Sequence, residues 1–119
     1  MKKERYEWTQ YKTDCGKYTC PIHKTALLIG DRWTLFIIRE FIYNGEQQGF
    51  NQLLRALKPI SSRTLSLKLK KMEANRLIER AIIQERPIQV QYTITKKGKA
   101  LKKALDSMGH WYKKYHPSR

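Results

Sequence analysis

The sequence is poor in negative charge. Asp and Glu account for only 10 of its 119 residues, against 25 Lys and Arg, which gives a formal net charge of +15. An excess of this size is usually offset by a polyanionic partner, most often nucleic acid and next an anionic membrane surface. Nucleic acid is therefore the first partner to test against the rest of the chain.

Long apolar runs are also missing. No stretch approaches the roughly 20 apolar residues that cross a bilayer, and the start, MKKERYEWTQYK, lacks the apolar segment of a signal peptide. We therefore expect no membrane partner and a cytoplasmic location. Cysteine is scarce as well. Cys15 and Cys20 are too few for a disulfide scaffold, so we expect free thiols unless they take part in redox or metal chemistry.

Catalytic motifs are absent from the sequence. There is no glycine-rich phosphate loop, no H-E-x-x-H, no C-x-x-C and no G-x-S-x-G, and the carboxylates are scattered. Cys15, Cys20 and His23 are possible metal ligands, but their spacing does not match the paired ligands of a zinc site. We expect neither an enzyme nor a bound metal or cofactor.

The stretch from Gly49 to Met72 concentrates the positive charge, with six basic residues and no acidic one. Pro59 divides it into two short helices, because proline cannot continue the first of them. A second helix is predicted from about Ser61 to Asn75. Two short helices with uncompensated positive charge are what a protein that binds the DNA major groove needs. The inward positions are Phe50, Leu53, Leu54 and Leu57 in the first helix and Leu65, Leu69 and Met72 in the second.

The flanking segments complete a recognisable order of elements. A helix begins at Pro21 and ends at Gly30, and an apolar core helix follows over 32–44. After the basic stretch, alternating residues predict strands at 80–84 and 89–95, and a last amphipathic helix spans about 97–115. The fold class is therefore mainly α with a small β-hairpin wing (α+β), the winged helix-turn-helix layout.

Particular residues in this frame also form a pattern over about Cys20 to Trp111: Cys20-Pro21, Ile29-Gly30-Asp31-Arg32-Trp33, Phe50, Leu53, Ile60-Ser61, Leu65, Leu69, Leu77-Ile78, Arg80, Val90, Tyr92, Thr95 and Gly98. With them the chain resembles the HxlR-type (DUF24) regulators of bacteria and archaea, which are relatives of the MarR group. The resemblance implies a homodimeric DNA-binding transcriptional regulator. It also maps onto Cys20 the cysteine through which many members sense electrophiles or oxidants.

Two positions depart from the family pattern. Arg76 stands where a glycine usually ends the recognition helix, and we expect Asn75 to adopt the left-handed conformation instead. Gly49 replaces a basic residue that often precedes Phe50. The domain prediction is an N-terminal arm of residues 1–19, followed by a winged helix-turn-helix domain of residues 20–119 that ends in a dimerisation helix.

The predicted DNA-binding residues have distinct roles. Those at the start of the recognition helix cap it and contact phosphate, those on its first turn contact base edges, and the later lysines contact the backbone. Leu67 would meet a thymine methyl group or another protein, and Arg86 a narrow minor groove or a phosphate. The plain alternative is a solvated cationic face. The predicted residues are Ser61, Ser62, Arg63, Thr64, Ser66, Leu67, Lys70, Lys71 and Arg86.

Two further sites are predicted. The helix N-terminus and nearby cations favour the reactive thiolate form of Cys20, with Cys15 as a possible resolving thiol; otherwise Cys20 is an ordinary small apolar residue. Apolar residues of the arm and the last helix form a dimer interface, unless the helix simply closes the monomer core. These residues are Trp8, Tyr11, Leu101, Leu105, Met108, Trp111 and Tyr112. The partners are then a second copy and a pseudo-palindromic DNA operator; the alternatives are a protein that coats DNA regardless of sequence and an RNA-binding or assembly protein.

Overall fold

The computed structural model describes residues 20–117 of the chain, which divides into two compact units, Met1–Asp31 and Arg32–Arg119. In the first unit, α2 (Pro21–Ile29) begins after Cys20 and ends at Gly30, whose N–H donates to the carbonyl of Ala26. The predicted bounds of this helix are confirmed. The division into an arm of residues 1–19 and a domain of residues 20–119 stays a prediction.

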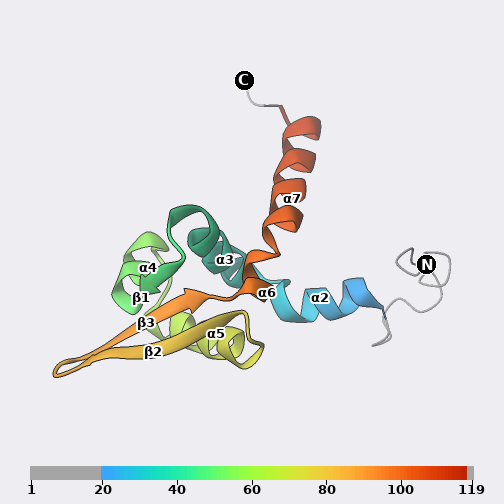
Figure 1. Cartoon of the computed structure of the whole chain (residues 1–119). Coiled ribbons are helices and arrows are strands. Elements are labelled where there is room, and N and C mark those ends of the chain that lie inside the picture. The colour runs from blue at the N-terminus through green and yellow to red at the C-terminus, as the bar shows by residue number, and fades with distance from the viewer. Residues whose placement is uncertain (1–19, 118–119) are drawn as a thin grey trace. The chain divides into compact units, whose positions relative to one another are not determined.

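The second unit contains the expected elements in the expected order, with one short strand and one short helix in addition (Figure 1). The helices of its core are connected by a short strand and one tight turn, and the hairpin and two further helices follow. The mainly α fold with a β-hairpin wing is confirmed. The elements are α3 (Arg32–Asn44), β1 (Gln47–Gly49), α4 (Phe50–Ala56), α5 (Ser62–Ala74), β2 (Ile78–Glu85), β3 (Ile88–Ile94), α6 (Lys96–Lys99) and α7 (Lys102–Tyr115).

The core of this unit lies between α3, α4, α5 and the base of the hairpin. Its largest fully buried side chain is Phe41 of α3. The helix spacing predicted for α5 is confirmed, because its three inward side chains are all buried, while the side chains of Arg63, Leu67 and Lys70 are exposed. The buried side chains of the unit include Ile37, Ile38, Phe41, Leu53, Leu65, Leu69, Met72, Ile78, Tyr92 and Ile94.

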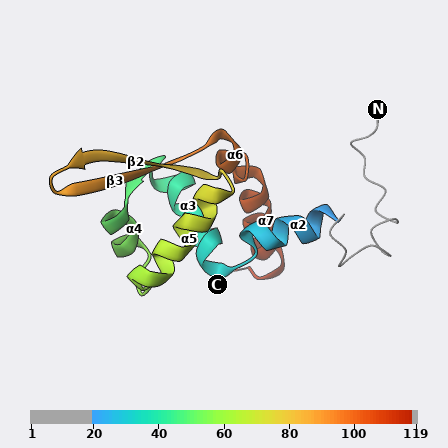
Figure 2. The ribbon, with the colours of Figure 1, turned by 90° about the horizontal axis from the view of Figure 1, so that it is seen from below.

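The sheet has three antiparallel strands in the order β1-β3-β2, one strand more than the sequence predicted. β1 lacks an apolar pattern and is held instead by hydrogen bonds. The Gln48 side chain is buried, and its amide donates to the carbonyls of Glu40 (3.1 Å) and Gly45 (3.0 Å). The β2–β3 hairpin is longer than predicted, and its turn projects beyond the helices of the unit (Figures 1 and 2).

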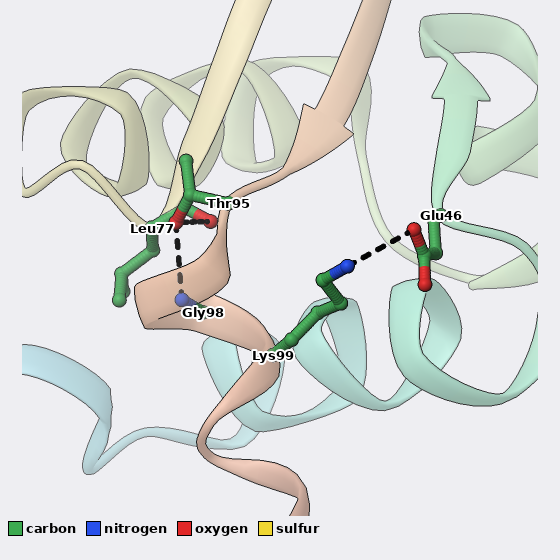
Figure 3. Close-up of polar contacts among 5 residues, drawn as sticks. All are labelled: Glu46, Leu77, Thr95, Gly98 and Lys99. Atoms are coloured by element: carbon green, nitrogen blue, oxygen red, sulfur yellow. Dashed lines mark hydrogen bonds and ion pairs between the residues drawn. The ribbon is translucent and has the colours of Figure 1, made fainter.

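Thr95 connects the base of the hairpin to the last helices (Figure 3). Its hydroxyl accepts from the N–H of Gly98 (3.0 Å) and lies within hydrogen-bond distance of the carbonyls of Arg76 (2.8 Å) and Leu77 (3.0 Å). Gly98 fits because a Cβ there would lie 2.5 Å from the Leu77 carbonyl oxygen. Lys99 forms an ion pair with Glu46 at 3.3 Å. These contacts fix α6, and with it the start of α7, on the sheet.

Candidate nucleic-acid interface

The turn between α4 and α5 is built as the sequence predicts. The N–H of Leu57 closes α4 on the carbonyl of Leu53, and the N–H of Ile60 bonds to the carbonyl of Leu57. Buried Ile60 attaches the turn to the core, while Lys58 and Pro59 are exposed. α5 then lies beside β2 (Figures 1 and 2). The turn and β2 therefore hold α5 against the core.

Ser61 caps α5. Its hydroxyl oxygen accepts from the N–H of Thr64 at 3.0 Å and donates to the hydroxyl of Thr64 at the same distance. Thr64 is half-buried, so it is less accessible than Arg63 next to it. Ser62 is the first helical residue and is exposed. The capped N-terminus carries the positive end of the helix dipole, which favours an anion such as phosphate.

The outer face of α5 brings together most of the predicted DNA-binding residues. Arg63 and Lys70 are exposed, and within residues 20–117 neither has a carboxylate partner. Leu67 is 56 % exposed, an unfavourable position for a leucine that meets only water. The exposed residues of this face are Ser61, Ser62, Arg63, Ser66, Leu67, Lys70 and Lys71. Arg86, the remaining predicted residue, lies apart from them in the turn of the hairpin.

The end of α5 corrects one prediction. Asn75 has a φ of −92°, and Arg76 itself adopts the left-handed conformation with a φ of 60°. The N–H of Leu77 donates to the carbonyl of Met72, and the N–H of Arg76 to that of Glu73. These two bonds form a Schellman motif, which requires the left-handed residue one position after the cap. The expectation for Asn75 was therefore wrong by one residue.

The last helix, α7, has no buried side chain. Together with α3 it lines an open apolar cavity of about 1140 Å³, to which Phe36, Tyr43 and Trp111 contribute. Of the predicted dimerisation residues, Leu101 and Leu105 are half-buried and the other three of this helix are exposed: Met108 (51 %), Trp111 (59 %) and Tyr112 (57 %). Trp8 and Tyr11 lie outside the described residues. An apolar face of this kind has more to gain from a partner than from water.

A polar cluster holds α7 against α3. The hydroxyl of Tyr43 donates to the Asp106 carboxylate, and Lys102 contacts the same carboxylate at 2.9 Å. The hydrogen bond from Tyr43, and then the one from Lys102, keeps the pKa of Asp106 below its usual value. Asp106 in turn raises the pKa of Tyr43 and of Lys102. The lowered pKa keeps Asp106 ionised, and so preserves both contacts, to a more acidic pH than an ordinary carboxylate would allow.

Cys20 is the N-cap of α2 and is completely buried, with its carbonyl accepting from the N–H of Lys24. A modifying reagent reaches such a thiol only when the chain around it opens. Cys15, the possible resolving thiol, lies outside the described residues. Within residues 20–117 no group of three or more potential metal ligands occurs, and no helix there is long and apolar enough to span a membrane.

Comparison with known proteins agrees with this geometry. The family model described as HxlR-like helix-turn-helix matches residues 28–119. The HTH-type transcriptional regulator YodB of Bacillus subtilis is 34 % identical over 97 residues, which are 81 % of this chain and 85 % of YodB.

Solved structures give the same result. The reduced form of YodB superimposes with a TM-score of 0.71 at 32 % identity, covering 84 % of this chain and 98 % of that one. The quinone-bound form of YodB superimposes with a TM-score of 0.69 at 29 % identity. The match covers 80 % of this chain and 98 % of that one. The redox regulator HypR in its reduced form superimposes with a TM-score of 0.73 at 26 % identity. The match covers 82 % of this chain and 95 % of HypR.

Proposed function

This chain belongs to the HxlR-like helix-turn-helix family of transcriptional regulators, and we propose that it acts as a homodimer that binds a pseudo-palindromic DNA operator through α5. The observation that carries the proposal is the exposed, acid-free outer face of α5, from Ser61 to Lys71, on a rigid and capped helix. In a chain with a net charge of +15, this face has the shape and charge to enter the major groove.

Each part of α5 contributes differently to DNA binding. Arg63 lies on the exposed first turn, where a guanidinium can donate two hydrogen bonds to O6 and N7 of guanine. Ser61 and Ser62 lie at the N-terminus, which favours a phosphate. Lys70 and Lys71 lie two turns further along and contribute charge to the backbone rather than sequence discrimination. Arg86 in the wing provides an additional contact beside the major groove.

The test compares two exposed cations of the same helix. Arg63→Ala should reduce the preference for the operator over random duplex by roughly tenfold to a hundredfold, since one bidentate base contact is worth about 1–3 kcal/mol. Lys70→Ala should weaken binding to all duplexes alike and reduce the slope of log affinity against log salt by about 1. Both affinities are measured by fluorescence anisotropy at several salt concentrations.

Two results would contradict the proposal. If both variants lost affinity equally for operator and random duplex, the division of α5 into base-contacting and backbone-contacting residues would be wrong. If the wild-type chain bound operator and random duplex with a ratio near one, the protein would coat DNA rather than regulate a specific site. Preference for folded RNA under the same conditions would support an RNA-binding protein instead.

We also propose that Cys20 is the residue through which this regulator responds to electrophiles. Support comes from its position at the N-cap of α2 and from the similarity to YodB, which has been solved in a quinone-bound form. The thiolate sulfur adds to a ring carbon of the quinone, and the ring takes up a proton to give a hydroquinone thioether. Because the thiol is buried, local opening must precede this step.

Cys20→Ser tests the sensor. Serine is a favoured N-cap residue, so the variant should fold and bind DNA as the wild type does. Added quinone should lower the operator affinity of the wild type and of Cys15→Ser, and leave that of Cys20→Ser unchanged. Mass spectrometry of the intact chain reports whether one quinone has been added. A Cys20→Ser variant that still loses affinity with quinone would exclude Cys20 as the sensing residue.

A further inference from the structure

The outer edge of β2 has no strand partner within residues 20–117. β2 pairs with β3 on one side only, and it stands at the end of the sheet order β1-β3-β2. Every residue from Glu79 to Gln89 is exposed, including Ile82 (52 %), Ile83 (56 %) and Ile88 (68 %). A free edge with exposed branched apolar side chains is a template for a further strand.

The sequence of this edge is complementary to itself in the antiparallel direction. Residues 79–86 are E-R-A-I-I-Q-E-R. If two copies lie antiparallel with Ile82 opposite Ile83, then Glu79 faces Arg86 and Arg80 faces Glu85. The arrangement has two-fold symmetry, so each of these pairs occurs twice. Opposite charges at facing positions of neighbouring strands are stabilising, and like charges there are destabilising.

The charge of the hairpin is also suited to self-association. From Ile78 to Ile94 it contains two Glu and two Arg, so its net charge is zero in a chain of +15. Two copies can therefore meet at this surface without added local repulsion between the two hairpins. None of the four charged residues forms an ion pair with another part of residues 20–117. All four are available to a second copy when Arg86 is not in contact with DNA.

A bulge sets the limits of the contact. The register between β2 and β3 shifts between Ile82 and Gln84, and such bulges commonly weaken the pairing of edge strands. In the antiparallel arrangement the bulge lies at the centre. The contact then depends on the two ends of the paired segment, where residues 79–81 of one copy lie beside residues 84–86 of the other. These ends contain all the charges. The contact should therefore be weak and sensitive to the charge pattern.

We propose that the β2 edge is a second self-association surface, at which two copies of this chain pair antiparallel through residues 79–86. This surface is separate from α7, so dimers formed through α7 would assemble further into tetramers. The inference does not rest on DNA binding. Two copies could pair at this edge even if the chain bound no operator. Conversely, the chain could bind an operator even if this edge did not self-associate.

A charge exchange tests the proposal in the absence of DNA. Sedimentation velocity of the full chain at increasing concentration should show a tetramer beyond the dimer. Glu79→Arg places like charges opposite Arg86 twice in each contact, and should weaken tetramer formation roughly tenfold. Adding Arg86→Glu to the same variant restores two opposite-charge pairs and should return the association to near the wild-type value. High salt should weaken the wild type and the double variant alike.

Glu46→Arg is the matched control, because it changes the net charge equally at an exposed residue just before β1, on the side of the sheet opposite to the β2 edge. It should leave tetramer formation close to that of the wild type. Circular dichroism should show unchanged folding in every variant, since all the altered side chains are exposed. The proposal is overturned if the wild type forms nothing larger than a dimer and Glu79→Arg leaves that dimer intact, or if Glu79→Arg and the double variant associate equally.

Discussion

Arg76 has a backbone conformation that suits glycine better than arginine. Its φ of 60° lies in the left-handed region, where a Cβ costs about 1–2 kcal/mol. Its side chain is exposed, so little packing compensates for that cost. Arg76→Gly should therefore raise the free energy of unfolding by about 0.5 kcal/mol, since the greater freedom of glycine in the unfolded chain cancels part of the gain. Urea denaturation followed by circular dichroism measures the change.

Asn75→Gly is the control for this substitution. Asn75 has a φ of −92°, so glycine relieves no strain there and should lower the free energy of unfolding. Equal effects at the two positions would mean that glycine acts only on the unfolded chain. A loss of stability in Arg76→Gly would mean that the arginine side chain contributes more than its exposure indicates.

Among the elements, α5 was the most predictable, because its information is local. Ser61 supplies the cap, and Leu65, Leu69 and Met72 follow the spacing of an α-helix. β1 could not be predicted, since its three residues have no apolar alternation. It exists because the Gln48 side chain bonds to two carbonyls of the preceding segment and because β3 pairs with it.

The last helix shows a second limit of sequence patterns. A single helix over 97–115 was expected, whereas α6 ends at Lys99 and α7 begins at Lys102. Ala100 and Leu101 keep right-handed helical φ values of −64° and −73°, so the break is small and leaves the apolar spacing intact. It follows from tertiary contacts of Thr95 and Gly98 with Leu77, which no local pattern records.

Parts of the candidate site that depend on local sequence could be predicted, and parts that depend on tertiary structure could not. Exposure of Arg63, Leu67 and Lys70 follows from helix periodicity and is confirmed, while their contacts with DNA stay a prediction. The free edge of β2 is visible only once the order of the strands is known. The charge pattern of residues 79–86 can be read from the sequence. It suggests self-association only once β2 is known to have no strand partner on its outer edge within the described residues.

At the scale of the whole molecule, the positive charge is unevenly distributed. The hairpin from Ile78 to Ile94 is neutral, so the net charge of +15 belongs to the rest of the chain. The salt dependence of DNA binding should therefore come mainly from the helices, with α5 foremost among them. In the proposed dimer, two copies of α5 on one duplex would double this contribution to operator affinity.

The dimer itself is tested at Trp111, which is 59 % exposed beside the cavity between α3 and α7. If α7 forms the proposed dimer interface, Trp111→Glu removes two indole rings that the interface would bury. At about 2 kcal/mol for each ring, the dissociation constant of the dimer should rise roughly a thousandfold. Sedimentation equilibrium should then show a monomer, and operator affinity should fall while a single half-site is still bound. Lys113→Glu, on the same helix, should leave the dimer intact. A Trp111→Glu chain that remains dimeric would place the interface elsewhere.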